Sequence, residues 1–151
     1  MDSGSQLGST NQHRHWNELH QERLPVSANS TASVFAQEVE NQLSRQANIL
    51  ELGCGAGSDA AFFAQQGHRV MALDFSEVAV NKVQTAYLSL PALYVDTADI
   101  SQHLSFNDHI FDAVYARLSL HYFSDQVTRT IFQEISRVLK VDGLLEPVMN
   151  F

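Results

Sequence analysis

Short apolar runs alternate along this chain with longer segments in which apolar residues recur every three or four positions. The runs lie at residues 49–52, 70–73, 93–95, 113–115 and 144–145. A short apolar run is typical of a parallel strand that is buried on both faces. In the segments between these runs, the apolar residues recur at the spacing of one face of an α-helix. The alternation therefore predicts an α/β fold with a parallel sheet, right-handed crossovers and helices on both faces.

Cap residues predict where the helices begin and end, because Ser favours the N-cap while Gly or a following Pro favours the C-terminal end. The expected helices begin after Ser30, run from Asp59 to Gly67, run from Ser76 to a point before Pro91, and run from Asp125 to Lys140. Their core-facing residues are expected to be Phe35, Val39, Leu43, Val80, Val83, Tyr87, Ile131, Ile135, Val138 and Leu139.

Composition favours one globular domain. The chain has 151 residues, of which 44% are hydrophobic, and this is enough to bury a substantial core. Residues 1–12 carry few apolar side chains, so we expect a flexible tail followed by one domain over residues 13–151. A formal net charge of −8 disfavours an extended nucleic-acid surface.

Cysteine content and hydropathy exclude other classes. Cys54 is the only cysteine, which rules out an internal disulfide and a metal site built from several thiolates, and no metal is expected. No apolar run reaches membrane-spanning length, and the N-terminus lacks the apolar core of a signal peptide. We therefore expect a soluble, cytoplasmic protein without a membrane partner.

The stretch Glu-Leu-Gly-Cys-Gly-Ala-Gly-Ser-Asp at residues 51–59 carries the most chemical information. It follows an apolar run and precedes an apolar helical pattern. A strand that turns through glycines into a helix brings bare backbone and unpaired N–H groups close to a ligand. Asp74 follows at the end of the second apolar run, where a carboxylate can accept hydrogen bonds from the hydroxyls of a ribose. The pattern predicts a site for a nucleoside-bearing ligand.

The spacing of the glycines distinguishes between ligands. Gly53, Gly55 and Gly57 give G-x-G-x-G rather than the dinucleotide pattern G-x-G-x-x-G, whose third glycine is replaced here by Ser58. Glu51 would repel a pyrophosphate but suits the cationic end of an amino-acid-bearing ligand. A nicotinamide oxidoreductase is therefore disfavoured.

These residues resemble motif I of the class I S-adenosylmethionine-dependent methyltransferases. Further segments resemble the later motifs of that family in the family's order, at residues 71–76, 97–100, 111–114 with 118–122, and 135–145. The resemblance implies a Rossmann-like doubly wound parallel sheet of strand order 3-2-1-4-5. It also implies S-adenosylmethionine as the cofactor and a small-molecule methyl acceptor.

The resemblance implies cofactor contacts at the carboxyl ends of the strands. The expected cofactor-binding residues are Trp16, Glu51, Gly53, Cys54, Gly55, Gly57, Asp74, Phe75, Ser76, Asp99, Ile100, Ala116 and Arg117. Asp99 would accept a hydrogen bond from the adenine amino group, with Asp96 as its competitor for that role. Ser76 is equally expected as a helix cap, and Trp16 would belong to an N-terminal segment that closes over the cofactor.

No residue is assigned as catalytic, because the cofactor carries the activation and the protein mainly positions the nucleophile. His121 is the candidate for an acid–base or acceptor-orienting role, since imidazole can take a proton near neutral pH. The alternative is a structural histidine within an apolar stretch.

The chain departs from the family pattern after the fifth strand. The usual antiparallel hairpin is missing, the usual K-P-G-G turn reads Lys-Val-Asp-Gly at residues 140–143, and Pro147 interrupts the expected strand. We expect a C-terminally incomplete domain whose fifth strand is an exposed apolar edge, and a homodimer through that edge would complete the sheet. The leading hypothesis is a methyltransferase, and the alternative is a non-catalytic or degenerate domain that binds S-adenosylmethionine.

Overall fold

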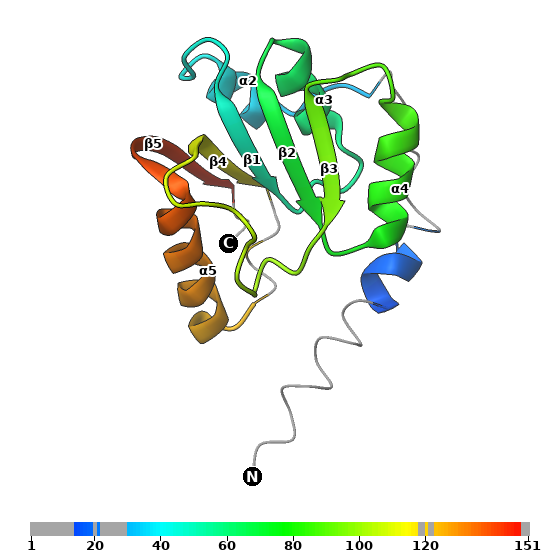
Figure 1. Cartoon of the computed structure of the whole chain (residues 1–151). Helices are drawn as coiled ribbons and strands as arrows, with labels where there is room; N and C mark the ends of the chain where they lie inside the picture. The colour runs from blue at the N-terminus through cyan, green and yellow to red at the C-terminus, as the bar shows by residue number, and fades with distance from the viewer. Residues whose placement is uncertain (1–13, 20, 22–29, 118–119, 121–122, 149–151) are drawn as a thin grey trace.

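The computed structural model describes residues 14–19, 21, 30–117, 120 and 123–148. The expected tail at residues 1–12 therefore lies outside the described residues. The elements in chain order are a helical segment at residues 14–19, α2 (Val34–Glu40), β1 (Asn48–Leu52), α3 (Ser58–Gln65), β2 (Arg69–Asp74), α4 (Glu77–Ala86), β3 (Leu93–Thr97), β4 (Phe111–Arg117), α5 (Asp125–Val138) and β5 (Leu139–Val148) (Figure 1).

The five strands form one parallel sheet in the order β3-β2-β1-β4-β5, which confirms the predicted fold class and strand order. β1 lies at the centre, so that Leu52 pairs with Leu73 of β2 and Glu51 pairs with Tyr115 of β4. From β1 the chain first adds β2 and β3 on one side and then returns to add β4 and β5 on the other, so the strand order reverses between β1 and β4. In a doubly wound sheet, ligands bind at the carboxyl ends of the strands beside this point.

Helices cover both faces of the sheet, as predicted. Side chains of α2 and α3, such as Val39 and Phe63, pack with Ile49 of β1 on one face, and α4 packs on the same face through Val83. On the other face, Ile131 and the rest of the apolar stripe of α5 pack on β1 and β4. The sheet is thus buried from both sides near its centre.

The first predicted helix begins later than expected. The N-cap of α2 is Ser33 rather than Ser30, and the Ser33 hydroxyl accepts a hydrogen bond from the backbone N–H of Ala36 at 3.1 Å. Phe35 is 47% exposed, whereas Ala36 and Val39 are buried. The inward placement of Val39 is confirmed, and that of Phe35 was wrong because the buried face of α2 runs through positions 36 and 39 rather than 35 and 39.

The last predicted helix ends earlier than expected. α5 stops at Val138, and Leu139 has the extended backbone of a strand, so Leu139 and Lys140 belong to β5. Pairing between β4 and β5 shifts between Phe111 and Ala113, where Lys140–Gly143 form an irregularity. Pro147 does not end the strand, since it lies in β5 opposite Ala116. β5 is an edge strand within the described chain, and Pro is tolerated on edge strands.

An ion pair at the end of α5 holds the β3–β4 loop (residues 98–110) against the helix. Arg137 donates hydrogen bonds to the carbonyl oxygens of Leu104 and Phe106 at 2.9 and 2.7 Å. Glu134 pairs with Arg137 and accepts a hydrogen bond from the backbone N–H of Leu104 at 2.8 Å. The loop has no regular secondary structure to provide hydrogen bonds for its backbone. These side-chain contacts therefore satisfy the backbone groups of Leu104 and Phe106.

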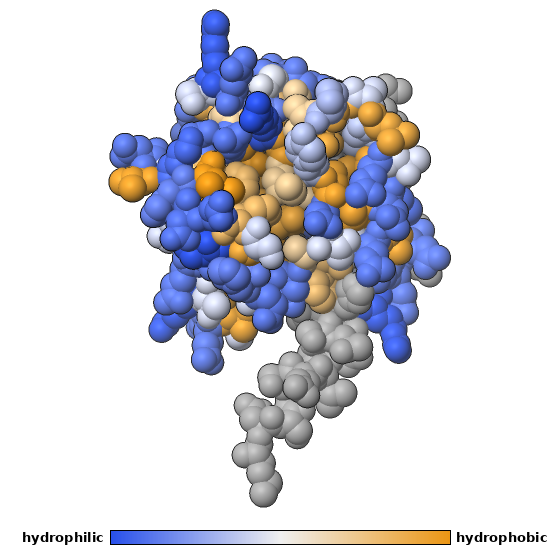
Figure 2. All heavy atoms as spheres, in the orientation of Figure 1, coloured by the Kyte–Doolittle hydropathy of each residue, from blue (hydrophilic) through white to orange (hydrophobic). Residues whose placement is uncertain are grey.

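α5 packs on one face of the sheet, and part of that face is left uncovered over β2 and β3. Figure 2 shows apolar side chains in the middle of this face, beside the polar surface of α5. Met71 of β2 is half-buried there, and its cross-strand neighbour Tyr94 is 58% exposed. In the part of the chain that the structure describes, no helix has the length and apolar content needed to cross a bilayer.

Acid should loosen the attachment of the β3–β4 loop. Hydrogen bonding from Arg137 lowers the pKa of Glu134 from 4.5 to about 2. A carboxyl group with a lowered pKa in the folded state stabilises the protein above its unfolded pKa, and this contribution is lost as the pH falls through the folded pKa. The free energy of unfolding, measured by urea denaturation, should therefore decrease between about pH 4.5 and about pH 2. Glu134→Gln should flatten this part of the profile, whereas Glu38→Gln, at an exposed position of α2, should not; equal profiles for both variants would contradict the assignment.

Candidate functional site

The glycine loop (residues 53–57) joins β1 to α3 and lies against the end of β2. Gly53, Gly55 and Gly57 have φ values of 72°, 52° and 76°, a left-handed conformation that other residues rarely adopt. The backbone N–H groups of Gly53 and Cys54 both donate to the carbonyl oxygen of Leu73, at 2.8 and 3.0 Å. The loop is thus fixed to the neighbouring strand by backbone hydrogen bonds.

Asp74, the last residue of β2, is held between the glycine loop and the start of α4. Its Oδ2 accepts a hydrogen bond from the N–H of Gly55 at 2.9 Å, and its Oδ1 accepts one from the N–H of Ser76 at 2.9 Å. The side chain is only 7% exposed. The two elements that the sequence analysis expects to face each other, the loop and the acid, are therefore in direct contact.

Two glycines of the loop have different surroundings. A Cβ at Gly57 would lie 2.6 Å from Cγ1 of Val83, so the missing side chain allows α4 to pack against the loop. A Cβ at Gly55 would have no atom within 4 Å. Only a glycine at position 55 leaves the backbone bare on this open side, which is the geometry that a closely approaching ligand needs.

Glu51 is a buried acid with an unsatisfied oxygen. Its side chain is 3% exposed, and its Oε2 has no hydrogen-bond partner among the described residues. Burial raises the pKa of Glu51 well above its usual value, the negative charge of Asp59 raises it further, and the positive charge of Arg117 opposes the shift. A buried polar atom of this kind calls for a partner, and a cationic group of a ligand would provide one.

Asp59, in the first turn of α3, is a site residue that the sequence analysis missed. It accepts hydrogen bonds from the N–H and hydroxyl of Ser33 at 2.7 and 2.8 Å, and from the hydroxyl of Tyr115 at 2.8 Å. Burial raises the pKa of Tyr115, which keeps its hydroxyl a donor. Asp59 thereby joins α2, α3 and β4 next to the glycine loop. The first-turn position of an acid was the only signal in the sequence, since its partners are far away in the chain.

The two candidate adenine acids have different positions. Asp99 follows the end of β3, beside Asp74, and accepts hydrogen bonds from the N–H and hydroxyl of Ser101. Ile100 is buried next to it. Asp96 lies within β3 opposite Leu73, and its side chain is exposed. Asp99 thus follows the carboxyl end of β3, whereas Asp96 lies within the strand.

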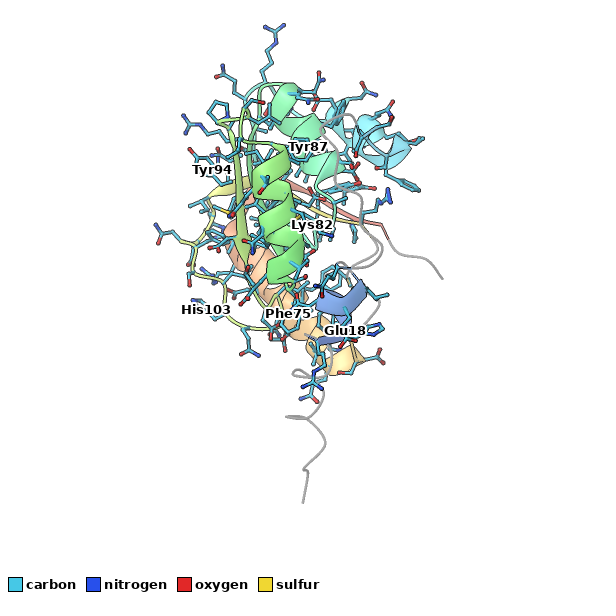
Figure 3. The ribbon with its side chains drawn as sticks, turned by 90° about the vertical axis from the view of Figure 1, so that its right-hand side faces the viewer. Glu18, Phe75, Lys82, Tyr87, Tyr94 and His103 are labelled. Atoms are coloured by element: carbon cyan, nitrogen blue, oxygen red, sulfur yellow. The ribbon has the colours of Figure 1, made fainter. Side chains whose placement is uncertain are left out.

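Ser76 and the N-terminal segment meet beside Asp74. The hydroxyl of Ser76 caps α4 by accepting from the N–H of Ala79 at 3.2 Å, and it donates to Oδ1 of Asn17 at 2.6 Å. Trp16, next to Asn17, stacks edge-on against His15 with a centroid distance of 5.7 Å. Figure 3 shows half-buried Phe75 close to the helix that carries Glu18. The segment with Trp16 therefore lies at the carboxyl end of β2, as the resemblance requires.

The remaining expected residues lie at the ends of β1 and β4. Cys54 is buried, and burial raises the pKa of its thiol well above its usual range, which makes it a poor nucleophile. Ala116 is buried and Arg117 is half-buried at the end of β4. His121 lies outside the described residues and stays a sequence-based prediction.

The donors and acceptors around the loop fit an adenosine that is linked to an amino acid. Asp74 is fixed beside the loop with a carboxylate that can accept from hydroxyl groups, the bare backbone at Gly55 can be approached closely, and the unsatisfied oxygen of Glu51 suits an ammonium group. Charges on the acids next to the glycine loop, Glu51 and Asp59, would repel a pyrophosphate. The arrangement favours a cationic ligand over a dinucleotide.

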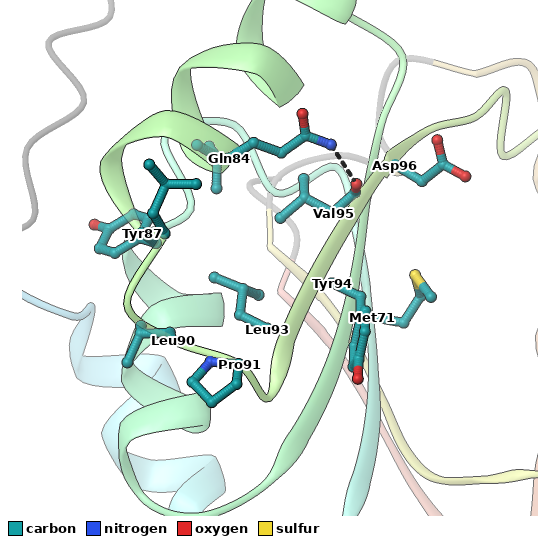
Figure 4. Close-up of a pocket in the computed structure, with 11 residues that line it drawn as sticks. Met71, Gln84, Tyr87, Leu90, Pro91, Leu93, Tyr94, Val95 and Asp96 are labelled. Carbon is teal, nitrogen blue, oxygen red and sulfur yellow. Dashed lines mark hydrogen bonds between the residues drawn. The ribbon is translucent and has the colours of Figure 1, made fainter.

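A separate open groove of about 570 Å³ surrounds the outer edge of β3 (Figure 4). Gln84 of α4 donates to the outward-facing carbonyl oxygen of Val95 at 2.9 Å across it. Tyr87, Pro91 and Tyr94 are among its lining residues, whereas none of the expected cofactor-binding residues lines it. The groove is therefore distinct from the candidate site.

Comparison with known proteins agrees with the geometry. A family model described as a methyltransferase domain matches residues 49–143. A curated uncharacterized methyltransferase from Synechocystis is 31% identical over 127 residues, which cover 79% of this chain and 58% of the relative. A demethylmenaquinone methyltransferase from Thermobifida fusca is 35% identical over 99 residues, which cover 64% of this chain and 41% of the relative.

Solved structures show the same fold. The phosphoethanolamine N-methyltransferase 1 of Haemonchus contortus, in complex with phosphoethanolamine and S-adenosylhomocysteine, has a TM-score of 0.78 at 16% identity, covering 95% of this chain and 33% of that one. A TehB-like methyltransferase from Corynebacterium glutamicum has a TM-score of 0.64 at 21% identity, covering 92% and 71%. The chain spans between about a third and three fifths of the length of the curated relatives that it matches.

Alanine at the two loop glycines should have unequal effects on stability. The left-handed backbone should cost each variant roughly 1–2 kcal/mol of unfolding free energy. Gly57→Ala should cost about 1–3 kcal/mol more, because its Cβ would overlap Val83. Chemical denaturation of both variants tests this. Val83→Ala should recover part of the extra loss in the Gly57→Ala background and none in the Gly55→Ala background; equal losses in the two single variants would contradict the packing role of Gly57.

Proposed function

The chain belongs to the family of class I S-adenosylmethionine-dependent methyltransferases, and on that premise we propose that it transfers the methyl group of S-adenosylmethionine to a small-molecule acceptor. The observation that carries the proposal is the contact between Asp74 and the glycine loop, 2.9 Å from Oδ2 to the N–H of Gly55. This contact supports the proposal because it holds Asp74, the proposed ribose acceptor, next to backbone that a ligand can approach closely. The net charge of −8 supports a small acceptor over a nucleic acid.

The residues at the carboxyl end of the sheet supply the binding groups. Asp74 would accept hydrogen bonds from the ribose hydroxyls, and Glu51 would pair with the amino group of the methionine part. The backbone of the glycine loop and of Ala116 would lie along the part of the cofactor that connects its ribose to its amino group. Asp99, with Ile100 and Phe75 beside it, would hold the adenine.

The main role of these residues in the reaction would be to position the cofactor and the acceptor. The cofactor, when bound, supplies a methyl group on a positively charged sulfur. The buried acids on this face, Glu51, Asp59 and Asp74, stabilise a cationic ligand electrostatically. The segment that carries Trp16 and Asn17, attached to Ser76 at 2.6 Å, would cover the site from the side of α4 and exclude water from it. Holding the two reactants in line accounts for most of the acceleration that such a site can provide.

Removal of the Asp74 carboxylate should weaken cofactor binding. Asp74→Ala deletes the ribose acceptor, and the loss of hydrogen bonds to a charged group should cost ~1–3 kcal/mol of binding free energy. Isothermal titration with S-adenosylhomocysteine measures this. Asp96→Ala, which removes an exposed acid of β3, is the matched control and should bind as the unaltered protein does. If the folded protein does not bind S-adenosylhomocysteine at all, the proposed function is wrong.

The choice between the two adenine acids can be tested with the same titration. Asp99→Ala should weaken binding by ~0.5–1.5 kcal/mol, the usual net value of one hydrogen bond. Adenosine and inosine analogues provide the specificity control, because inosine lacks the amino group that Asp99 would accept from. Asp99→Ala should reduce the preference for the adenosine form, and an unchanged preference would assign the adenine contact elsewhere.

Turnover needs its own assay. Formation of S-adenosylhomocysteine from S-adenosylmethionine should be detected in the presence of an acceptor and should be slower in Asp74→Ala at cofactor concentrations that just saturate the unaltered protein. Tight cofactor binding without product formation over a broad panel of small amines, alcohols, thiols and carbon acids would favour a binding domain instead.

A further inference from the structure

Glu51 and Asp59 are neighbouring carboxyl groups that have very different partners. Asp59 accepts three hydrogen bonds, two from Ser33 and one from Tyr115, at 2.7–2.8 Å. It also lies in the first turn of α3, where the helix dipole favours a negative charge. Asp59 therefore has the partners that a carboxylate anion needs. Glu51 has a buried oxygen without any partner among the described residues.

The surroundings of Glu51 disfavour a second negative charge. Its side chain is 3% exposed, so ionisation would leave a charge in a poorly solvated place. The charges of Asp59 on α3 and Asp74 at the end of β2 both oppose ionisation, and the half-buried Arg117 on β4 favours it. The neighbouring thiol of Cys54 and hydroxyl of Tyr115 stay neutral, since burial raises the pKa of each. Burial is the largest of the effects that raise the pKa of Glu51, and the negative charge of Asp59 is the next largest.

A cationic ligand group would reverse this balance. An ammonium group beside Oε2 supplies both a hydrogen-bond donor and an opposite charge, each of which favours the ionised form of a carboxyl group. We infer that Glu51 is protonated in the ligand-free protein and releases its proton to solvent when the amino group of the ligand binds, which makes Glu51 a specificity-determining residue for ligands that carry that group. The inference rests on the proposed function and concerns the same site.

The exchange is balanced in charge and atoms. The carboxyl O–H of Glu51 loses one proton to the buffer, the ligand keeps its ammonium proton, and an ion pair replaces a neutral acid. Binding that releases a proton becomes tighter as the pH rises, up to the pH at which Glu51 is already ionised in the free protein. A nucleoside without the amino acid part forms no ion pair and should leave Glu51 protonated. The site thus discriminates between the two ligands more strongly as the pH increases.

Titration calorimetry in two buffers of different ionisation enthalpy at one pH measures the number of protons released. S-adenosylhomocysteine should release close to one proton from the unaltered protein, and 5′-methylthioadenosine, which lacks the amino acid, should release none. Glu51→Gln keeps the size of the side chain and cannot titrate, so it should release none with either ligand and bind S-adenosylhomocysteine at least tenfold more weakly. Asp59→Asn should reduce the number released, because a neutral neighbour lets Glu51 ionise before binding.

The outcomes separate this inference from the proposed function. Tight binding of S-adenosylhomocysteine without proton release, or equal release from Glu51→Gln, overturns the inference and leaves the methyltransferase assignment standing. If no binding occurs, the proposed function fails instead. The protonation of Glu51 can then still be read by infrared spectroscopy, where the band of a protonated carboxyl group should be present at neutral pH in the ligand-free protein and absent in Glu51→Gln. Absence of that band in the unaltered protein overturns the inference directly.

Discussion

The hydrogen bond from the N–H of Gly55 to Oδ2 of Asp74 is the interaction on which the rest of the site depends. It joins the loop after the central strand to the end of the next strand. Two further N–H groups of that loop donate to the carbonyl oxygen of Leu73, so three backbone donors of the loop are satisfied by the last two residues of β2. A residue without an acceptor oxygen at position 74 would remove the side-chain part of this attachment. Glu51 lies at the end of β1 on one side of the loop, and Ser76 follows β2 on the other.

The site concentrates negative charge in a place from which solvent is largely excluded. Three acids, Glu51, Asp59 and Asp74, are each less than a tenth exposed. Such a cluster is costly unless each acid is hydrogen-bonded, neutral or paired with a cation. Asp59 and Asp74 satisfy the first condition through backbone and side-chain donors. Oε2 of Glu51 has no hydrogen-bond partner among the described residues, and this difference links the electrostatics of the fold to the charge of the proposed ligand.

Local patterns in the sequence predicted the parallel α/β fold, the glycine loop and the cap of α4, because each depends on residues that are close together in the chain, whereas the strand order came from the resemblance to a family. They did not predict the partners of Asp59, which come from α2 and β4. Ser30 and Ser33 are chemically equal candidates for the cap of α2, and only the contact of Ser33 with Asp59 decides between them. The end of α5 was missed for a related reason, since Leu139 continues the apolar stripe of the helix but pairs with Phe111 in the sheet. In each case a tertiary contact overrides a local preference.

Several residues that hold the fold together are also proposed to bind the ligand. Asp74 holds the loop and is the proposed ribose acceptor, and Ser76 caps α4 while it binds Asn17 of the N-terminal segment. Loss of activity in variants of these residues therefore does not separate a binding role from a structural one. Glu51 is different, because its Oε2 makes no hydrogen bond among the described residues and so contributes none to the fold. A polar atom that is buried without a partner lowers stability, and its replacement by a neutral isostere should not weaken the folded state. A ligand group that pairs with such an atom, at the end of the central strand and next to bare backbone, would give a physical reason for its being there.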